Sequence, residues 1–404
     1  MIVSFPRLRN VKTAYTKTSD ELLLVFGNKI MLKTIKLENF RSFQSFELQQ
    51  LGRVNLLVGK NNSGKTSILE AIQLLCSRNN LEPLRQTMMK RSEYCVDDEL
   101  KPAQEFDIRH LFYGHEIEQG SKFSITGTNS NIQQGLFVSI ELSKISSKEI
   151  LSSSHEPLFL YEEEVPDVLR KLYFSIQWNY GREEEALELP LSANTGLHSE
   201  YIRRVRRDSK NPVPKIQFVT SSSLGTEKMV ELFDQIVLTP EEKLVEQALR
   251  SIDSKIKRIA PVSSQKLRYS LDSRGGFFVL LDSGQRVPIG SMGDGIWRIL
   301  GLALATVCAK DGYLFVDEID TGLHFTAMSD MWKMIWDTAK RLNVQVFATT
   351  HNSDCWTSLA SIAEQGDTTE DGIRIHRIER GKNTSVVFTE PQIVIAAERD
   401  IEVR

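Results

Sequence analysis

Apolar and polar positions along the chain predict strands and helices in alternation. Residues Leu32 to Phe40 alternate with a period of two, which is typical of a half-buried strand. A second apolar run, Val54 to Val58, leads through a glycine-rich turn into apolar residues at helical spacing between Ile68 and Leu75. Strand, turn and helix follow one another in the order that a phosphate-binding loop requires.

The carboxyl-terminal half shows the same alternation. Apolar residues at helical spacing, Ile256 included, predict a pair of helices at about 226–260, separated at Thr239-Pro240 because proline interrupts a helix. Turn residues at Ser273 to Gly276 and at Asp282 to Gly284 predict strands between 266 and 289. The elements expected beyond these are a helix, a strand, a helix, a strand and a hairpin, at Trp297–Ala309, Tyr313–Val316, His324–Leu342, Val344–Thr349 and around Arg380-Gly381.

The pattern is weaker elsewhere. Short strands are expected at Phe137–Leu142, Leu172–Trp178 and Lys215–Val219, without a defined topology. Residues 1–30 allow two interpretations. Met31 is the natural start, or an ordered extension adds a strand through Leu22 to Phe26.

Composition narrows the class of protein. A chain of 404 residues with 41% hydrophobic and 25% charged residues is typical of two or three globular domains, and a net charge of −3 excludes a polybasic protein. The longest apolar stretch, Ile299 to Ala309, is shorter than the ~20 residues that span a bilayer, so we expect a soluble, cytoplasmic protein. The four cysteines are too scattered to indicate a disulfide framework or a zinc ribbon.

The most specific motif has the pattern G-x-x-x-x-G-K-[ST] and consists of Gly59, Lys60, Asn61, Asn62, Ser63, Gly64, Lys65 and Thr66. Its glycines let backbone N–H groups point at a phosphate, Lys65 reaches the β- and γ-phosphate oxygens, and the Thr66 hydroxyl binds Mg²⁺. Ser67 completes the expected nucleotide-binding set. The alternative is a glycine-rich turn without a ligand.

Two acidic residues end the apolar strand at Tyr313–Val316. Ligands bind at the carboxyl ends of parallel strands, and adjacent side chains on a strand point to opposite sides. We therefore assign Asp317 to Mg²⁺ and Glu318 to the attacking water as general base. The alternative is a strand end that meets solvent.

His351 follows the strand that begins at Val344, and its distance from Asp317 fits one βαβ crossover. The two strands are then neighbours, and His351 lies beside the phosphates as a γ-phosphate sensor rather than as a helix cap or loop residue.

Another glycine-rich segment, from Pro288 to Gly295, precedes an apolar helix and predicts a second anion site that includes Ser291 and Gly293. One chain has no need of two sites for one γ-phosphate. Two copies arranged head to tail would use both sites, because each would close its Ser291/Gly293 loop over the ATP held by the Lys65 of the other.

These motifs in this order resemble the ABC-type ATPases of the SMC, RecF and overcoming-lysogenization-defect (OLD) group. The segments Ile35–Phe43, Lys60–Ser63 and Asp317–His324 are most similar to the OLD-like and RecF-like branch, and the similarity covers about 31–90 and 266–360. The resemblance implies a P-loop NTPase with an ABC-type mixed or parallel α/β sheet core flanked by helices. It also implies that Ser291 and Gly293 act in trans, that Asp320 lies at the dimer seam and that His351 is the switch histidine.

The expected domains follow from the same resemblance. Residues 31–90 and 266–404 form the ATPase core, 91–265 an inserted smaller α+β or helical lobe with helices at about 226–260, and 1–30 an extension. Met292 stands where many relatives have glycine, and no Q-loop glutamine is assigned. Too few residues follow His351 for a fused Toprim nuclease, so the expected partners are a second copy and a separately encoded effector such as a nuclease, in phage defence or DNA repair.

Two weaker signals remain open. The basic run from Arg203 to Arg207, with Lys210, contacts a DNA backbone or is a solvated surface that pairs with Glu183 to Glu185. His110, His115 and Glu116 suggest a metal site only faintly, because no second pair of ligands accompanies them.

The expected function is hydrolysis of ATP to ADP and phosphate with Mg²⁺, catalysed by Glu318, His351 and Lys65 in a dimeric conformational switch. The alternative is a regulatory module that binds ATP with little or no turnover. A GTPase is disfavoured because no N-K-x-D follows the phosphate loop.

Overall fold

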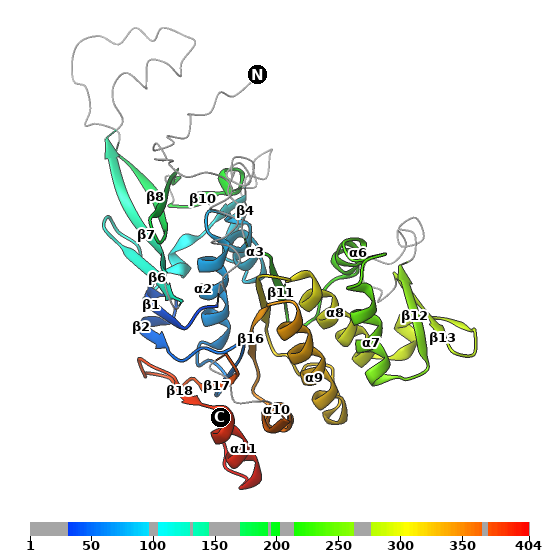
Figure 1. Cartoon of the computed structure of the whole chain (residues 1–404). Coiled ribbons are helices and arrows are strands. Elements are labelled where there is room, and N and C mark those ends of the chain that lie inside the picture. Colours follow the sequence, from blue (N-terminus) through cyan, green and yellow to red (C-terminus); the bar gives the residue numbers. More distant parts are fainter. Residues whose placement is uncertain are drawn as a thin grey trace, which may run out of the picture. The chain divides into compact units, whose positions relative to one another are not determined.

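The computed structural model describes residues 31–96, 104–129, 132–144, 170–192, 195–202, 214–261, 276–365 and 371–403 (Figure 1). It divides into two compact units. The first consists mainly of residues 35–46 and 70–213, and the second mainly of residues 47–69 and 214–404. The expected extra strand through Leu22 to Phe26 and residues 273–275 of the expected turn at Ser273 to Gly276 lie outside the described residues.

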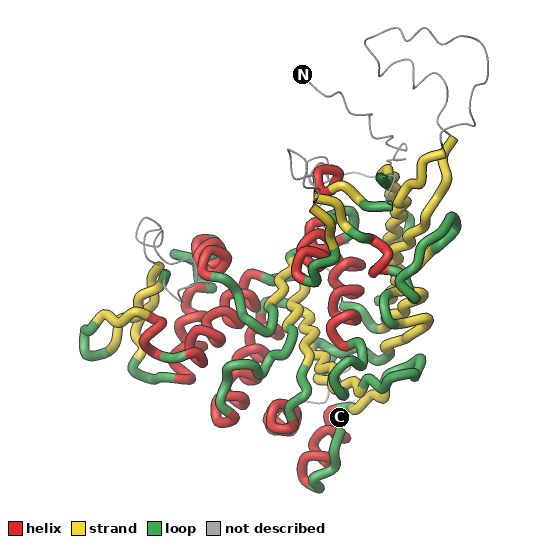
Figure 2. Tube along the Cα trace, turned by 180° about the vertical axis from the view of Figure 1, so that it is seen from behind, coloured by secondary structure: helices red, strands yellow, loops and turns green. Residues whose placement is uncertain are grey.

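The first unit is built mainly from strands (Figure 2). Its larger sheet has the order β2-β1-β6-β7-β8-β9, and its smaller sheet the order β10-β5-β4. The larger sheet comprises β1 (Thr34–Phe40), β2 (Phe43–Leu48), β6 (Lys122–Thr128), β7 (Gln133–Lys144), β8 (Arg170–Tyr180) and β9 (Glu183–Pro190). The smaller elements are α3 (Glu82–Lys90), β4 (Tyr94–Val96), β5 (Gln104–Phe106) and β10 (Leu197–His198). The strands expected near 137–142 and 172–178 are therefore confirmed within β7 and β8.

The second unit contains a six-stranded sheet of order β11-β15-β16-β3-β17-β18, in which all neighbours are parallel except β17 and β18. Its strands are β3 (Val54–Val58), β11 (Ile216–Val219), β15 (Tyr313–Val316), β16 (Gln345–Thr349), β17 (Ile373–Arg377) and β18 (Val386–Phe388). A three-stranded sheet contains β12 (Ile256–Pro261), β13 (Phe277–Leu281) and β14 (Arg286–Pro288). The mixed α/β core that the sequence predicts is confirmed.

Helices surround this sheet. They are α6 (Thr226–Asp234), α7 (Glu242–Ile252), α8 (Asp294–Cys308), α9 (Phe325–Arg341), α10 (Ser353–Gln365) and α11 (Glu390–Glu398), while α2 (Lys65–Ser77) follows β3. The central helix is α8, which packs against β11, α6, α7 and α9 (Figure 1). None of the helices within the described ranges has both the length and the apolar character needed to cross a membrane.

A row of aromatic side chains fixes the register of the parallel strands. Phe218, Phe315 and Phe347 are paired residues on β11, β15 and β16, and their rings stack with centroids 6.2 and 5.6 Å apart. Because a shift by one residue would turn each side chain to the other face, this row keeps the carboxyl ends of the strands level. The predicted adjacency of the strands before Asp317 and His351 is confirmed.

Two expectations about residues 214–265 are wrong. Helix α7 ends at Ile252, and Ile256 begins β12, where it pairs with Leu281. The helices α6 and α7 also belong to the second unit, together with β11, and not to a lobe inserted at 91–265. Their apolar sides pack against α8, and this tertiary packing is invisible to a local pattern.

We predict that Gln345→Leu destabilises the second unit. The buried Gln345 amide accepts from the Leu32 N–H and donates to the Leu32 and Gly52 carbonyls, each at 2.9 Å. Leucine would leave the Leu32 N–H and carbonyl without this partner, whereas the Gly52 carbonyl would keep its hydrogen bond from Asn55 Nδ2. The free energy of unfolding should therefore fall by about 1–3 kcal/mol in urea denaturation. The control Gln247→Leu, at an exposed position of α7, should change it by less than about 0.5 kcal/mol.

Candidate functional site

The phosphate-binding motif forms the turn between β3 and α2. Gly59 and Gly64 have φ of 142° and 93°, and an added Cβ at Gly59 would lie 2.4 Å from the Ile378 carbonyl oxygen. Asn62 also adopts a left-handed φ of 61°, which asparagine tolerates better than most residues. Lys60, Asn61 and Asn62 are exposed, whereas Ser63 and Ser67 are buried. The turn therefore needs glycine at Gly59 for two reasons, its φ and the close approach of Ile378.

Lys65 lies at the first position of α2 with its ammonium group folded toward the loop. Its Nζ donates to the carbonyl oxygens of Gly59 and Lys60 at 2.7 and 2.9 Å. Burial lowers the pKa of Lys65, and the nearby carboxylates of Asp317 and Glu318 oppose that shift. The cation thus lies in the field of the two acidic residues that the sequence singled out.

Thr66 and Asp317 form a compact group of oxygen atoms. The Thr66 hydroxyl is 3.1 and 3.2 Å from the two Asp317 carboxylate oxygens, and the Thr349 hydroxyl donates to Asp317 Oδ1 at 2.7 Å. Two adjacent ligands of an octahedral Mg²⁺ with bonds of ~2.1 Å are ~3 Å apart. The Thr66 and Asp317 oxygens have that spacing, and both are hard ligands, so this pair fits Mg²⁺.

Glu318 is held apart from Asp317 by the backbone. Its φ of 46° is left-handed, and its N–H donates to Thr349 Oγ1 at 2.8 Å. Its side chain is half-exposed, with Oε2 3.3 Å from the Thr321 hydroxyl and Oε1 4.0 Å from Nδ1 of the half-exposed His351. A carboxylate beside an imidazole at a solvent-accessible edge can accept a proton from water.

The structure therefore brings together Lys65, Thr66, Asp317, Glu318 and His351 at the carboxyl edge of the parallel strands. Ser291 and Gly293 take no part in the contacts that join these residues. Ser291 is exposed in the short 3-10 turn Ile289–Met292, and Gly293, with φ of 91°, is the residue just before α8. Asp320 is buried, and its carboxylate accepts from the Thr350 hydroxyl at 2.6 Å.

Comparison with known proteins identifies the family. Residues 54–354, about three quarters of the chain, match the family model described as "AAA domain, putative AbiEii toxin, Type IV TA system". The chain belongs to this AAA family. The segment matched contains the phosphate loop, Asp317, Glu318 and His351.

Curated relatives agree with this assignment. The AAA-family chain is 21% identical over 354 residues to an "ATP/GTP phosphatase" of Helicobacter pylori, covering 83% of this chain and 90% of that one. It is 22% identical over 398 residues to the "DNA replication and repair protein RecF" of Clostridioides difficile, covering 88% and 98%. The expected membership in the SMC, RecF and OLD group of P-loop ATPases is confirmed.

Among solved structures, the SMC head domain from Thermotoga maritima matches with a TM-score of 0.43 and 11% identity, covering 89% of this AAA-family chain and 99% of that one.

Two residues of the site carried no assignment from sequence. Thr349 joins Asp317 to the Glu318 backbone, and Arg298 donates to the carbonyl oxygens of both acidic residues at 3.3 and 2.8 Å. The signals were present: Thr349 precedes His351 in Thr-Thr-His, and Arg298 is a single cation in an otherwise apolar run.

The weaker sequence signals gain little support in the AAA-family chain. His110 Nδ1 lies 3.3 Å from His115 Nδ1, and His110 Nε2 lies 3.4 Å from Asp107. Within the described residues, no three His, Cys, Asp or Glu side chains are grouped so that they could hold a metal ion. The basic run Arg203–Arg207 and Lys210 lie outside the described residues.

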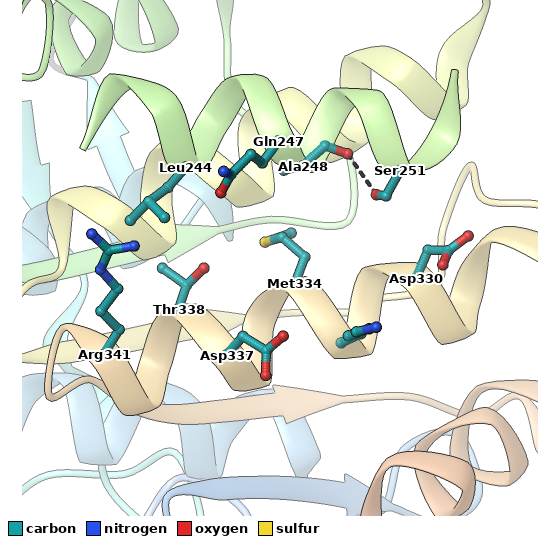
Figure 3. A pocket seen from close by; sticks show the side chains of 10 residues that line it. Leu244, Gln247, Ala248, Ser251, Asp330, Met334, Asp337, Thr338 and Arg341 are labelled. Atoms are coloured by element: carbon teal, nitrogen blue, oxygen red, sulfur yellow. Dashed lines mark hydrogen bonds between the residues drawn. The ribbon is translucent and has the colours of Figure 1, made fainter. Parts of the chain in front are cut away.

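A groove between α7 and α9 is separate from this chemistry (Figure 3). Residues of both helices line it, among them Gln247, Ser251, Met334 and Asp337, and none of the candidate site residues does. Its lining mixes acidic, basic and apolar side chains.

We predict that Thr349→Val destabilises the site. Thr349 is buried, and valine would leave the Glu318 N–H and one Asp317 oxygen without this partner, at a cost of about 1–3 kcal/mol in the free energy of unfolding. Thr306→Val is the matched control, because the equally buried Thr306 hydroxyl donates only to the Leu302 carbonyl within α8. Equal losses for the two variants in urea denaturation would contradict the bridging role of Thr349.

Proposed function

We propose that this chain binds ATP with Mg²⁺ and hydrolyses it to ADP and phosphate, working as a head-to-tail dimer that encloses the nucleotide. The observation that carries this proposal is the spacing of the Thr66 hydroxyl and the Asp317 carboxylate, 3.1 and 3.2 Å, directly behind a phosphate loop. That arrangement suits a metal-bound nucleoside triphosphate better than any other ligand class.

Each residue then has a distinct task. The N–H groups of the Gly59–Thr66 loop and the Lys65 ammonium group bind the β- and γ-phosphates. Thr66 and Asp317 hold Mg²⁺, which when bound neutralises charge on the phosphate oxygens. Glu318 accepts a proton from the attacking water, and His351, 4.0 Å from that carboxylate, contacts the γ-phosphate and senses its presence.

The second copy supplies the rest of the site. Ser291 is exposed, Gly293 directly precedes helix α8, and neither joins the contacts around Lys65 of its own chain. A helix amino terminus with free N–H groups attracts anions, so this loop is suited to the γ-phosphate held by another copy.

The conformational change of the dimer acts on a separately encoded effector protein. An effector nuclease in DNA repair or phage defence is supported by the names of the RecF relatives, which refer to DNA replication and repair, and by the resemblance to OLD proteins. DNA itself is a candidate ligand of the same assembly.

We expect Glu318→Gln to lower phosphate release by about 10²–10⁴-fold, because the amide cannot accept the proton of the attacking water. ATP affinity should stay within a few-fold, since Lys65, Thr66 and Asp317 are intact. Light scattering should then detect a dimer that persists in ATP. Glu364→Gln, on the exposed face of α10, is the matched control and should retain full turnover.

Other outcomes separate the alternatives. Equal turnover by Glu318→Gln would remove the general base from the mechanism. ATP-raised melting without phosphate release by the unmodified chain, even at high protein concentration, would instead identify a module that binds ATP as a conformational ligand. Unchanged nucleotide affinity in Lys65→Ala would reject the phosphate loop as the binding site.

A further inference from the structure

Arg298 is a buried cation at a position where a cation is costly. It lies in the second turn of α8, and only 3% of its surface is exposed. Asp294 and Arg298 are the two charged residues of this helix, and Asp294 is exposed at its start. Burial lowers the pKa of Arg298 to about 10, so the guanidinium is still charged at neutral pH. Such a buried charge requires good hydrogen-bond acceptors.

The acceptors of Arg298 are backbone carbonyls that follow two adjacent strands. One terminal nitrogen donates to the Thr220 carbonyl oxygen, just beyond β11, at 2.5 Å. The other donates to the carbonyl oxygens of Asp317 and Glu318, just beyond β15, at 3.3 and 2.8 Å. The planar fork of arginine can reach two strand ends at once, and the single ammonium group of lysine cannot reproduce that geometry.

These contacts complete the support of an unusual backbone conformation at Glu318. A left-handed φ is unfavourable in a residue with a side chain and persists where its surroundings enforce it. The Glu318 N–H is held by Thr349, and the Glu318 carbonyl is held by Arg298. The Glu318 carbonyl also accepts from the Thr321 N–H at 3.1 Å, so each polar group of this residue's backbone has a partner outside its own loop, and the carbonyl has one inside it as well.

The same helix begins at the loop that we assign to the nucleotide of the second copy. Gly293 is the residue before α8, and Arg298 follows it by little more than one helical turn. The body of α8 is buried from Ile296 to Cys308, so its residues are packed in fixed positions relative to one another. A displacement of the Ser291/Gly293 loop would therefore move the guanidinium.

We propose that Arg298 is a positioning residue that couples the Ser291/Gly293 loop to Glu318 of the same chain. This coupling rests on the proposed ATP hydrolysis, and it adds that the state of the Ser291/Gly293 loop determines the position of Glu318. Contact of the loop with ATP held by a second copy sets the Glu318 backbone through Arg298, so that each copy aligns its own general base only after it has engaged the other copy's nucleotide.

The test begins with Arg298→Lys, which keeps the charge and removes the fork. Turnover should fall roughly 10- to 100-fold, because a small displacement of a catalytic group has effects of that size. Affinity for ATP in dilute protein should stay within about threefold, since the side chains of Lys65, Thr66 and Asp317 are untouched.

Arg53→Lys is the matched control. Arg53 is another buried arginine whose guanidinium donates to backbone carbonyls, those of Ala339 and Val344, and it lies at the amino-terminal end of β3. Its replacement should lower the melting temperature without lowering turnover per folded molecule. Equal loss of turnover in both variants would show that Arg298 acts only through general stability.

A double-mutant cycle distinguishes coupling from two independent defects. Turnover is measured for Ser291→Ala, Arg298→Lys and the double variant. If Arg298 transmits the state of the loop, the double variant should be less impaired than the product of the single effects, by about threefold or more. Multiplicative effects, or full turnover in Arg298→Lys, would overturn the proposal.

A second measurement remains decisive if Arg298→Lys does not fold. Ser291 is exposed, so Ser291→Ala should fold normally. In the otherwise unmodified chain carrying Glu318→Gln, ATP should slow hydrogen–deuterium exchange over residues 317–321 only at concentrations where two copies associate. Ser291→Ala should abolish that protection, and unchanged protection would refute the coupling.

The outcomes keep the two proposals apart. Absence of ATP hydrolysis by the unmodified chain rejects the proposed function. Hydrolysis that depends on Glu318 but is indifferent to Arg298 rejects only the coupling.

Discussion

The register of the parallel strands β15, β16 and β3 is the constraint on which the rest of the site depends. Each of these strands is fully buried, and the loop after each carries part of the candidate chemistry. The backbone hydrogen bonds continue past the strand ends, from the Thr350 N–H to the Leu57 carbonyl and from the Ile319 N–H to the Thr349 carbonyl. This register therefore brings Asp317, His351 and the phosphate loop to one edge, where the Thr66 hydroxyl lies 3.1 and 3.2 Å from the two Asp317 carboxylate oxygens.

Buried polar side chains then fix the loops that lie beyond the backbone hydrogen bonds of the sheet. Gln345 and Asn55 bind backbone groups near the amino-terminal ends of the strands, whereas Thr349 and Arg298 bind them at the carboxyl ends. Such side chains stabilise the fold only when every partner is present, because an unpaired buried polar group costs more than a hydrogen bond contributes. The acidic loop after β15 is thus a defined structure in which Asp317 and Glu318 contact different groups.

The backbone conformation of Glu318 affects both the stability of the loop and the direction of its carboxylate. A glutamate in left-handed conformation is unfavourable locally, and the surrounding contacts from β16 and α8 maintain it. The strain directs two adjacent carboxylates to two sets of partners, one beside Thr66 and the other beside His351. Helix α8 takes part in this support through Arg298, which links the core of the second unit to the carboxyl edge of the strands.

Local sequence patterns were sufficient to predict many elements of this molecule. The amino-acid sequence determined the phosphate loop, the strand and the helix on either side of it, and the adjacency of the strands before Asp317 and His351. It did so because glycine chemistry and apolar periodicity are local properties. The same locality explains the errors. Ile256 continued a helical apolar spacing, and only its pairing with Leu281 placed it in a strand. The helices at 226–252 joined the second unit because their apolar faces pack against α8, a partner that lies far along the chain.

Tertiary structure alone decided which polar groups hold the site together. Thr349 and Arg298 are distant in sequence from the partners described above, so their places in the sequence could mark them as unusual but could not identify what they hold. Hydrogen bonds between backbone carbonyls and a distant guanidinium leave no periodic trace in a sequence. They follow from the register of the sheet and the packing of α8, which are properties of the whole folded unit.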